Sequence, residues 1–273
     1  MVNREGQLKR QPLFYVLASV RFEAWLSLAD KIPEIQSRLR DFLPISANLL
    51  HTAMGVNVGA DVPRDRQSWA FHTANRLLGC HILPDQIIVH ALEYSGFAAF
   101  SKTISSVVDA VLMSAGHLDC RSIGIRYLDL IQPEEGETLD QYVPAGILPF
   151  SNDKLRAKQF KDIGGISQAS YRTEDGVLQA RFWTGQDLSF VPDDLIPLYL
   201  LTKDPGSMRQ QGIPPLSPGA GILDSDSIWM AQVPSKLTTD EIIGKLTNLH
   251  GHATSYFRSV CTEHAFEVWQ GEN

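Results

Sequence analysis

The chain has 273 residues, of which 44% are hydrophobic and 20% charged, and its 24 Lys and Arg face 31 Asp and Glu for a net charge of −7. This acidic balance argues against wide, sequence-independent binding to a nucleic-acid backbone. The length suits one large domain or two small ones, and the ordinary composition predicts a sizeable hydrophobic core.

The cysteines and the amino terminus indicate the cellular setting. Cys80, Cys120 and Cys261 lie far apart and form no Cys-x-x-Cys pair, so neither a disulfide framework nor a cysteine zinc site is predicted. The first ten residues are polar and lack the apolar core of a signal peptide, and no run of about 18 apolar residues predicts a membrane span. We therefore expect a cytoplasmic protein that does not associate with a membrane.

The first half of the chain, residues 1–135, begins with a strand and a helix. Alternation of apolar side chains predicts the strand over 12–22, and apolar residues three and four apart predict the helix over 28–43. Pro33 fits this helix only in its first turn. Residues 45–66 are punctuated by Gly and Pro and are expected to be mostly loop.

Further strand patterns follow, with a second helix before the last of them. The strands are predicted at 68–73, 77–83, 86–94 and 121–131. Ser95 is the expected N-cap of the helix, and Gly116 is expected to end it. This order matches a ferredoxin-like, split β-α-β unit with its helices on one face of an antiparallel sheet. The first and last strands are then neighbours at the sheet centre, which brings Arg21 close to Arg126.

The second half, residues 136–273, is predicted to be rich in strands. A short helix is expected near 138–143, and a hairpin is expected from strands at 166–172 and 177–183. A further strand is predicted at 221–233.

A loop and a long helix complete the second half. Pro and Gly crowd residues 203–221, which indicates an exposed loop. The sequence Thr238-Thr-Asp-Glu241 is a capping box that begins the helix, which is expected to reach about residue 269 with a break near Cys261. The fold prediction is an α+β protein: a ferredoxin-like half packed on a β-rich half, as two domains or one continuous domain.

Six short motifs follow one another along the chain. They are Pro-Leu-x-Tyr-Val-Leu-x-x-Val-Arg-Phe from Pro12, Ile-Gln-x-x-Leu-Arg from Ile35, Trp-x-Phe from Trp69, Gly-Ile-Arg-Tyr-Leu-Asp from Gly124, Asp-x-Asp from Asp224 and Leu-His-x-x-x-x-x-x-Phe from Leu249. Together they resemble a sporadically distributed bacterial family of uncharacterised proteins, about 250 residues long, that carries only a placeholder name. The resemblance implies no activity, but the patchy distribution implies mobile genes, as in defence or toxin–antitoxin loci.

Arg126 and Asp129 are the first candidates for a functional site. Their strand is apolar on both faces, so both charges are expected to be buried, where they need partners or mark a site. One interpretation is an anion-binding or acid–base site at the sheet centre. The other is a structural ion pair between Arg126 and an acidic residue of a neighbouring strand.

Other candidates come from acidic and histidine side chains. Asp224 and Asp226 share one face of a strand, about 7 Å apart at the backbone, which suits oxygen ligands of Mg²⁺ or Mn²⁺ as well as a solvated face. His250 lies on the apolar stripe of the last helix, either as a base or ligand or as a core histidine. His72 and His90 are expected on neighbouring strands, which also permits a metal.

The motifs of the common enzyme classes are missing from the sequence. It contains no Gly-x-Gly-x-x-Gly, Walker loop, Gly-x-Ser-x-Gly or His-Glu-x-x-His, so no cofactor is expected and enzyme activity stays open. The leading hypothesis is a non-enzymatic binding or regulatory protein. It would present the loop at 203–221 and aromatic residues such as Trp183 and Trp229 to a protein partner.

Two alternatives belong to other functional classes. One is a metal-dependent phosphodiesterase or nuclease that uses Asp224 and Asp226 as ligands. The other is an RNA-binding protein that contacts phosphate through Arg21 and Arg126 on a ferredoxin-like sheet. The acidic net charge and the lack of an aromatic RNA-binding pattern argue against this second alternative.

Overall fold

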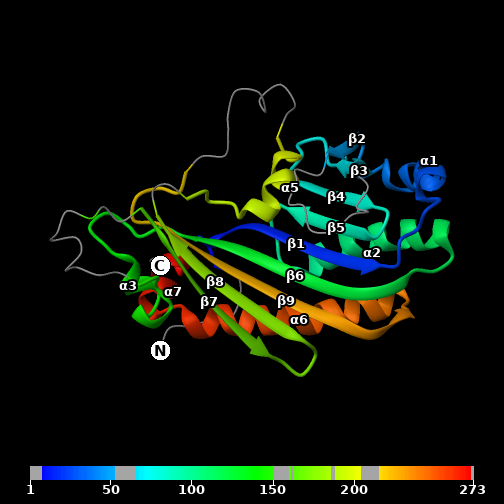
Figure 1. Ribbon diagram of the computed structural model, residues 1–273. Coiled ribbons are helices and arrows are strands. Elements are labelled where there is room, and N and C mark those ends of the chain that lie inside the picture. The colour runs from blue at the N-terminus through cyan, green and yellow to red at the C-terminus, as the bar shows by residue number, and fades with distance from the viewer. Residues whose placement is uncertain are drawn as a thin grey trace.

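The computed structural model describes residues 8–52, 65–150, 160, 163–185, 188–203 and 215–271. Within them, nine strands form one sheet in the order β2-β3-β4-β5-β1-β6-β9-β8-β7, and every neighbouring pair is antiparallel (Figure 1). The strands are β1 (Leu13–Phe22), β2 (Ile45–Thr52), β3 (Asp65–His72), β4 (Leu78–Leu83), β5 (Gln86–Ala91), β6 (Asp119–Ile131), β7 (Gly165–Arg172), β8 (Val177–Thr184) and β9 (Gly221–Lys236). The predicted α+β class, with a large antiparallel sheet, is confirmed.

Helices lie on both sides of this sheet. They are α1 (Leu28–Leu39), α2 (Phe97–Ala115), α3 (Leu139–Tyr142), α5 (Ile196–Leu200), α6 (Thr239–Val260) and α7 (Glu263–Gln270), with the 3₁₀ turns η1 (Ala145–Ile147) and η2 (Asp193–Leu195). The capping box predicted at the start of α6 is present, because the Thr238 side chain accepts from the Glu241 amide. The break predicted near Cys261 is also confirmed, since α7 begins two residues later.

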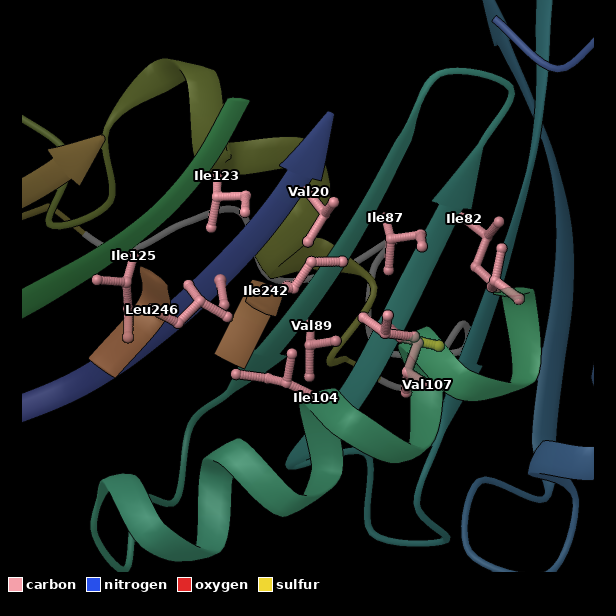
Figure 2. Close-up of a cluster of buried hydrophobic side chains, with 14 of the residues drawn as sticks. Val20, Ile82, Ile87, Val89, Ile104, Val107, Ile123, Ile125, Ile242 and Leu246 are labelled. Carbon is pink, nitrogen blue, oxygen red and sulfur yellow. The ribbon is translucent and has the colours of Figure 1, made fainter. Parts of the chain in front are cut away.

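The main core lies between one face of the sheet and the helices α1, α2 and α6. Figure 2 shows Ile242 and Leu246 of α6 gathered with Val20 of β1 and Ile125 of β6. The buried residues of α6 recur three or four positions apart, which gives the helix one apolar face toward the sheet. Burial of each such Leu or Ile side chain contributes about 1.5–3 kcal/mol relative to exposure.

A second cluster of buried side chains covers the centre of the opposite face. There η2 and α5 pack on the sheet through Leu195, Leu198 and Tyr199, which meet Leu17 of β1 and Leu128 of β6. The two faces of β6 therefore belong to different cores. This agrees with the prediction that both faces of this strand are covered.

A third cluster closes one end of the molecule. It joins α3 and α7 through Tyr142, Phe266 and Trp269. The amino-terminal segment reaches the same place, because the Arg10 amide donates to the Trp269 carbonyl at 2.8 Å. The two ends of the chain are thus tied together beside the central strands.

Three local predictions differ from the structure. Within the predicted loop at 45–66, residues 45–52 form strand β2, because they pair with β3 along their whole length, and residues 53–64 lie outside the described residues. Ser95 is not the N-cap of α2; Gly96 takes this position with φ of 112°, a value that favours glycine. Pro33 is the sixth residue of α1 rather than in its first turn, and the residue four positions earlier, Ala29, faces solvent, where water can satisfy its carbonyl.

The order of strands tests the predicted arrangement of the first half. β1 and β6 are neighbours at the sheet centre, as expected. The antiparallel run between the two helices is larger than expected, because four strands, β2 to β5, follow one another across the sheet. The sheet continues across the predicted boundary at residue 135 through the pairing of β6 with β9.

Helix α2 has the length and apolar composition of a membrane-spanning helix. Its buried residues include Phe100, Ile104, Val107 and Val111, which belong to the main core. A core helix of a globular protein meets the same criteria of length and composition, and the packing of this apolar stripe on the sheet accounts for it here.

Leu246→Ala tests the packing of α6 on the sheet. Leu246 is fully buried, so we expect the substitution to lower the free energy of unfolding by about 2–5 kcal/mol, measured by urea denaturation. Leu26→Ala removes the same atoms from a side chain that is 92% exposed, so it should change stability by less than about 0.5 kcal/mol. Equal losses in the two variants would contradict the predicted core.

Candidate functional site

Arg126 lies at the centre of the sheet between two carboxylates. Its side chain is 5% exposed, and its Nε and Nη2 donate to the two oxygens of Asp224 at 2.8 Å each. Its Nη1 donates to Oδ2 of Asp194 at 2.6 Å. Nη2 of Arg181 lies 2.9 Å from Asp224 Oδ2, so two guanidinium groups share one fully buried carboxylate. We call Arg126, Arg181, Asp194, Asp224 and Asp226 the arginine cluster.

The register of the strands explains the arginine cluster. Arg126 of β6 lies opposite Asp226 of β9, and Asp224 of β9 lies opposite Arg181 of β8. Burial alone would lower the pKa of Arg126, but its hydrogen bonds to Asp224 and Asp194 raise it above the ordinary value. The two-pronged contact with Asp224 has the fork geometry that guanidinium groups form with carboxylates. The structural interpretation of Arg126, an ion pair with a neighbouring strand, is therefore confirmed.

A cavity of about 480 Å³ adjoins the arginine cluster and is lined by Arg21, Arg126 and Asp226. Arg21 lies opposite Ser122, four residues before Arg126, so alternation turns both arginines to this cavity. None of the described residues forms a hydrogen bond to the Asp226 carboxyl group. Burial raises the pKa of Asp226 to about 6, and the charge of Arg126 only partly opposes this.

A second cavity, of about 300 Å³, lies on the opposite face between β6, β9, the amino-terminal segment and the helices α2 and α6. Aromatic rings form much of its wall. The rings of Phe97 and His250 are stacked with centroids 4.4 Å apart, and the rings of Tyr94 and Tyr127 are 5.9 Å apart. We call it the aromatic cavity. Its lining residues include Tyr94, Phe97, Tyr127, Asp129, Ser225, His250, Ala253, Thr254, Phe257, Arg258 and Phe266.

Asp129 is the acidic group of the aromatic cavity. It follows Tyr127 by two positions on β6, so both side chains lie on the face toward α6. Asp129 is 5% exposed, and its carboxyl group accepts no hydrogen bond from any described residue. Burial, and then the charge of Asp224, raises the pKa of Asp129 to about 8, so its carboxyl group is mostly neutral at pH 7.

Ser225 is a second polar group without a partner in the aromatic cavity. It lies on β9 opposite Tyr127 and is 1% exposed. Its Oγ is buried and forms no hydrogen bond among the described residues. Most buried polar side chains in proteins are paired, so two unpaired groups on adjacent strands at one cavity need an explanation.

His250 reaches the aromatic cavity from α6. Its Nδ1 lies 2.8 Å from the hydroxyl of Tyr127 and 3.3 Å from that of Thr254. Burial and the charge of Arg258 lower the pKa of His250, and burial raises that of Tyr127. Both groups are therefore neutral at pH 7, with the Tyr127 hydroxyl in a position to donate to the imidazole.

The sheet separates the predicted site residues into two groups. Arg21, Arg126, Asp224 and Asp226 lie on the face of the arginine cluster, whereas Asp129 and His250 meet in the aromatic cavity. Sequence reasoning missed Asp194 and Arg181, whose contacts to the cluster depend on η2 and on the register of β8. It also missed Tyr94, Tyr127 and Ser225. Tyr127 carried a signal, because it lies on the same strand face as Asp129.

The residues proposed as metal ligands have other contacts. Both oxygens of Asp224 accept from arginine, so a divalent ion there would have to displace a guanidinium group. Strand β4 separates the strands of His72 and His90, so the prediction that these strands are neighbours is wrong. Their rings still meet edge to face, 5.3 Å apart, and Gly79 lies opposite both. Among the described residues, no group of three His, Cys, Asp or Glu side chains could hold a metal.

The aromatic residues expected at a partner surface are packed against the protein itself. Trp183 is 5% exposed and donates from its indole nitrogen to the Ser189 carbonyl, so its prediction as a surface residue is wrong. Trp229 is half-buried and lies beneath the Lys245 ammonium, 3.8 Å from the ring centroid. Most of the predicted loop at 203–221 lies outside the described residues.

Comparisons of the chain with protein-family models, with curated proteins and with solved structures find no significant match.

Asp224→Asn tests the role of Asp224 as the shared counter-ion. The substitution leaves the guanidinium groups of Arg126 and Arg181 without this carboxylate, so we expect the free energy of unfolding to fall by about 3–5 kcal/mol in urea denaturation. Asp226→Asn is the matched control on the same strand face. Because burial disfavours the charged form of Asp226, its neutralisation at pH 7 should cost little or stabilise the protein. A loss as large as that of Asp224→Asn would contradict this assignment.

Asp129→Asn should make stability less sensitive to pH. The pKa of Asp129 is about 8 in the folded protein and ordinarily 3.8, so the folded state binds the proton more tightly. The free energy of unfolding therefore falls as pH rises from about 4 to about 8. We expect Asp129→Asn to lose less stability than the wild type between pH 5 and pH 8, and to be the more stable protein at pH 8. Parallel stability curves in urea denaturation would refute the buried position of this carboxyl group.

Proposed function

We propose that this protein is a non-enzymatic binding module that holds a small organic molecule in the aromatic cavity. The observation that carries the proposal is the Asp129 carboxyl group, which is buried, lines the cavity and has no hydrogen-bond partner among the described residues. A buried polar group without a partner costs about 1–3 kcal/mol, and a ligand that pairs with it removes this cost on binding. Ser225 offers a second such group on the adjacent strand.

The composition of the aromatic cavity supports the same proposal. Sites for small molecules combine mostly apolar and aromatic walls with a few convergent polar groups. Phe97, Phe257 and Phe266 supply apolar wall here, while Asp129 and Ser225 supply polar groups from adjacent strands. The volume of about 300 Å³ is at the small end of known ligand pockets and suits a compact molecule.

A regulatory role follows from the elements that meet at the cavity. Its wall includes Leu8 and Gln11 of the amino-terminal segment and Thr254 of α6, so a ligand contacts both elements and favours the state in which they are packed together. We infer a protein partner that covers exposed apolar side chains of β9, where Met230 and Val233 are each 73% exposed. We infer that ligand binding and partner binding are linked.

The proposal also covers the cellular setting of the protein and the ferredoxin-like arrangement of its first half. We infer a cytoplasmic bacterial protein, encoded in a mobile defence or toxin–antitoxin-like locus, from the order of motifs and from cysteines that lie far apart and suggest no disulfide framework. We also infer an enlarged ferredoxin-like first half. It is supported by β5 and β6, which run parallel with β1 between them and are joined by α2, as in a split β-α-β unit.

The two alternative functions have less support. A metal-dependent nuclease would need Asp224 as a ligand, but both its oxygens accept from arginine. RNA binding on the sheet would need Arg126 to reach phosphate, but Arg126 is 5% exposed and held by Asp224 and Asp194. Of the two arginines, Arg21 alone is exposed, and one cation gives little affinity for a phosphate backbone.

Thr254→Phe tests whether the aromatic cavity binds ligands. Thr254 lines the cavity from α6, so a larger ring there should fill the space and abolish binding. The assay is thermal denaturation with a library of small aromatic amines, alcohols and carboxylates, because a ligand at a hundredfold excess over its Kd stabilises by about 2.7 kcal/mol. Thr247→Phe, on an exposed position of the same helix, is the matched control and should bind as the wild type does. If no compound of any class stabilises the wild type in a Thr254-dependent way, the proposed function is wrong.

A further inference from the structure

We propose that the ligand of the aromatic cavity is an organic cation, a primary ammonium group on a compact hydrocarbon body, with the Asp129 carboxylate as its counter-ion. This inference rests on the proposed function, because it names the class of ligand that the same cavity takes. It comes from a comparison of two buried acidic groups in the same sheet.

Asp224 and Asp129 are both buried, but only Asp224 has cations. Asp224 is 0% exposed and is contacted by the guanidinium groups of Arg126 and Arg181. Asp129 is 5% exposed, on the opposite face, and forms no ion pair with any described residue. A buried carboxylate needs a cation or several hydrogen bonds to stay charged. At Asp224, arginine side chains of the protein are the cations. At Asp129, the cavity has space for a ligand that brings the cation.

Ser225 extends the polar end of the cavity beside Asp129. It lies opposite Tyr127 on the adjacent strand and lines the same cavity, and its buried Oγ has no hydrogen-bond partner among the described residues. A primary ammonium group has three donors, so it can donate to the Asp129 carboxylate and to the Ser225 oxygen together. A tertiary or quaternary ammonium group has too few donors to satisfy both. The pair of acceptors therefore favours an ammonium group with at least two N–H donors, and a primary amine provides three.

The rings around the polar end favour a positive charge. Tyr94 and Tyr127 lie edge to face at this end, with their ring centroids 5.9 Å apart, and Phe97 lines the same space. The faces of aromatic rings attract cations by about 0.5–2 kcal/mol each, with the larger values at desolvated sites. Phe257, Phe266 and Ala253 complete an apolar wall, which suits a hydrocarbon body rather than a second charged group.

No other titratable group that the structure describes at the cavity forms an ion pair with Asp129, so the counter-ion has to come from the ligand. His250, Tyr94 and Tyr127 are neutral at pH 7, because burial lowers the pKa of His250 and raises those of the tyrosines. Arg258 lines the cavity from the same helix as His250, whose pKa it lowers. The pKa of Asp129 is about 8, so a bound ammonium group drives its ionisation and a proton leaves the protein.

The experiment compares three probes of similar shape, 2-phenylethylamine, 2-phenylethanol and 3-phenylpropionate, by isothermal titration calorimetry at pH 7. We expect the amine to bind at least about tenfold more tightly than the alcohol, as a charge-assisted hydrogen bond allows, and the carboxylate to bind most weakly. Asp129→Asn should abolish the preference for the amine. Because this substitution keeps the shape of the side chain and removes a buried ionisable group, the variant should fold.

Two controls separate this inference from the proposed function. Asp226→Asn, on the opposite face of the sheet, should keep the preference for the amine. The affinity of the wild type for the amine should rise by up to about tenfold per pH unit between pH 6 and pH 8, while that for the alcohol stays level or falls. If Thr254→Phe blocks binding but the alcohol or the carboxylate binds as tightly as the amine, the cavity is a binding site and the cation is wrong. If no probe or library compound binds, the proposed function itself fails.

Discussion

The contact between Arg126 and Asp224 is the constraint on which the arrangement of the centre of the sheet depends. It joins β6, the last strand of the first half, to β9, a strand of the second half, and both side chains are buried. Removal of either partner takes away the main counter-ion of a buried charge, so the register between these two strands is strongly specified. A slip of one residue would turn Arg126 toward the helices α2 and α6 and into the main core.

The same contact organises the face on which it lies. Arg126 has a third hydrogen-bonding nitrogen, which donates to Asp194 of η2 and so fixes the short helices η2 and α5 over the centre of the sheet. Their apolar side chains then seal the second core against β1 and β6. One guanidinium group thus links a strand pair to the segment that covers it. Burial raises the pKa of Asp129, and the negative charge of Asp224 raises it further. A charge on one face of the sheet therefore affects the protonation of a group on the other face.

The sequence was sufficient for most of the strands and helices and insufficient for the site. Alternation and three-and-four spacing predicted β1, β6, α2 and α6, because these elements bury one or two whole faces and the pattern repeats along their length. Strand β2 was missed, because an edge strand buries little and its side chains need no regular pattern. The burial of Arg126 and Asp129 was predictable from their apolar neighbours, but their partners were not. Asp194 and Arg181 meet Arg126 and Asp224 only through the register of β8 and the fold of η2, which no local pattern encodes.

The spacing of Arg126 and Asp129 decides how strand β6 has to be interpreted. Residues three apart on a strand lie on opposite faces, so these two charges cannot form one site. The polar groups on the two sides then differ in a way that matters for function. On one side, the arginine and carboxylate side chains of the protein pair with one another, and these contacts stabilise the sheet. On the other side, Asp129 and Ser225 have hydrogen-bonding capacity that no described residue uses. Since burial of unused capacity costs free energy, the position of these groups beside an aromatic-lined cavity supports the proposed ligand.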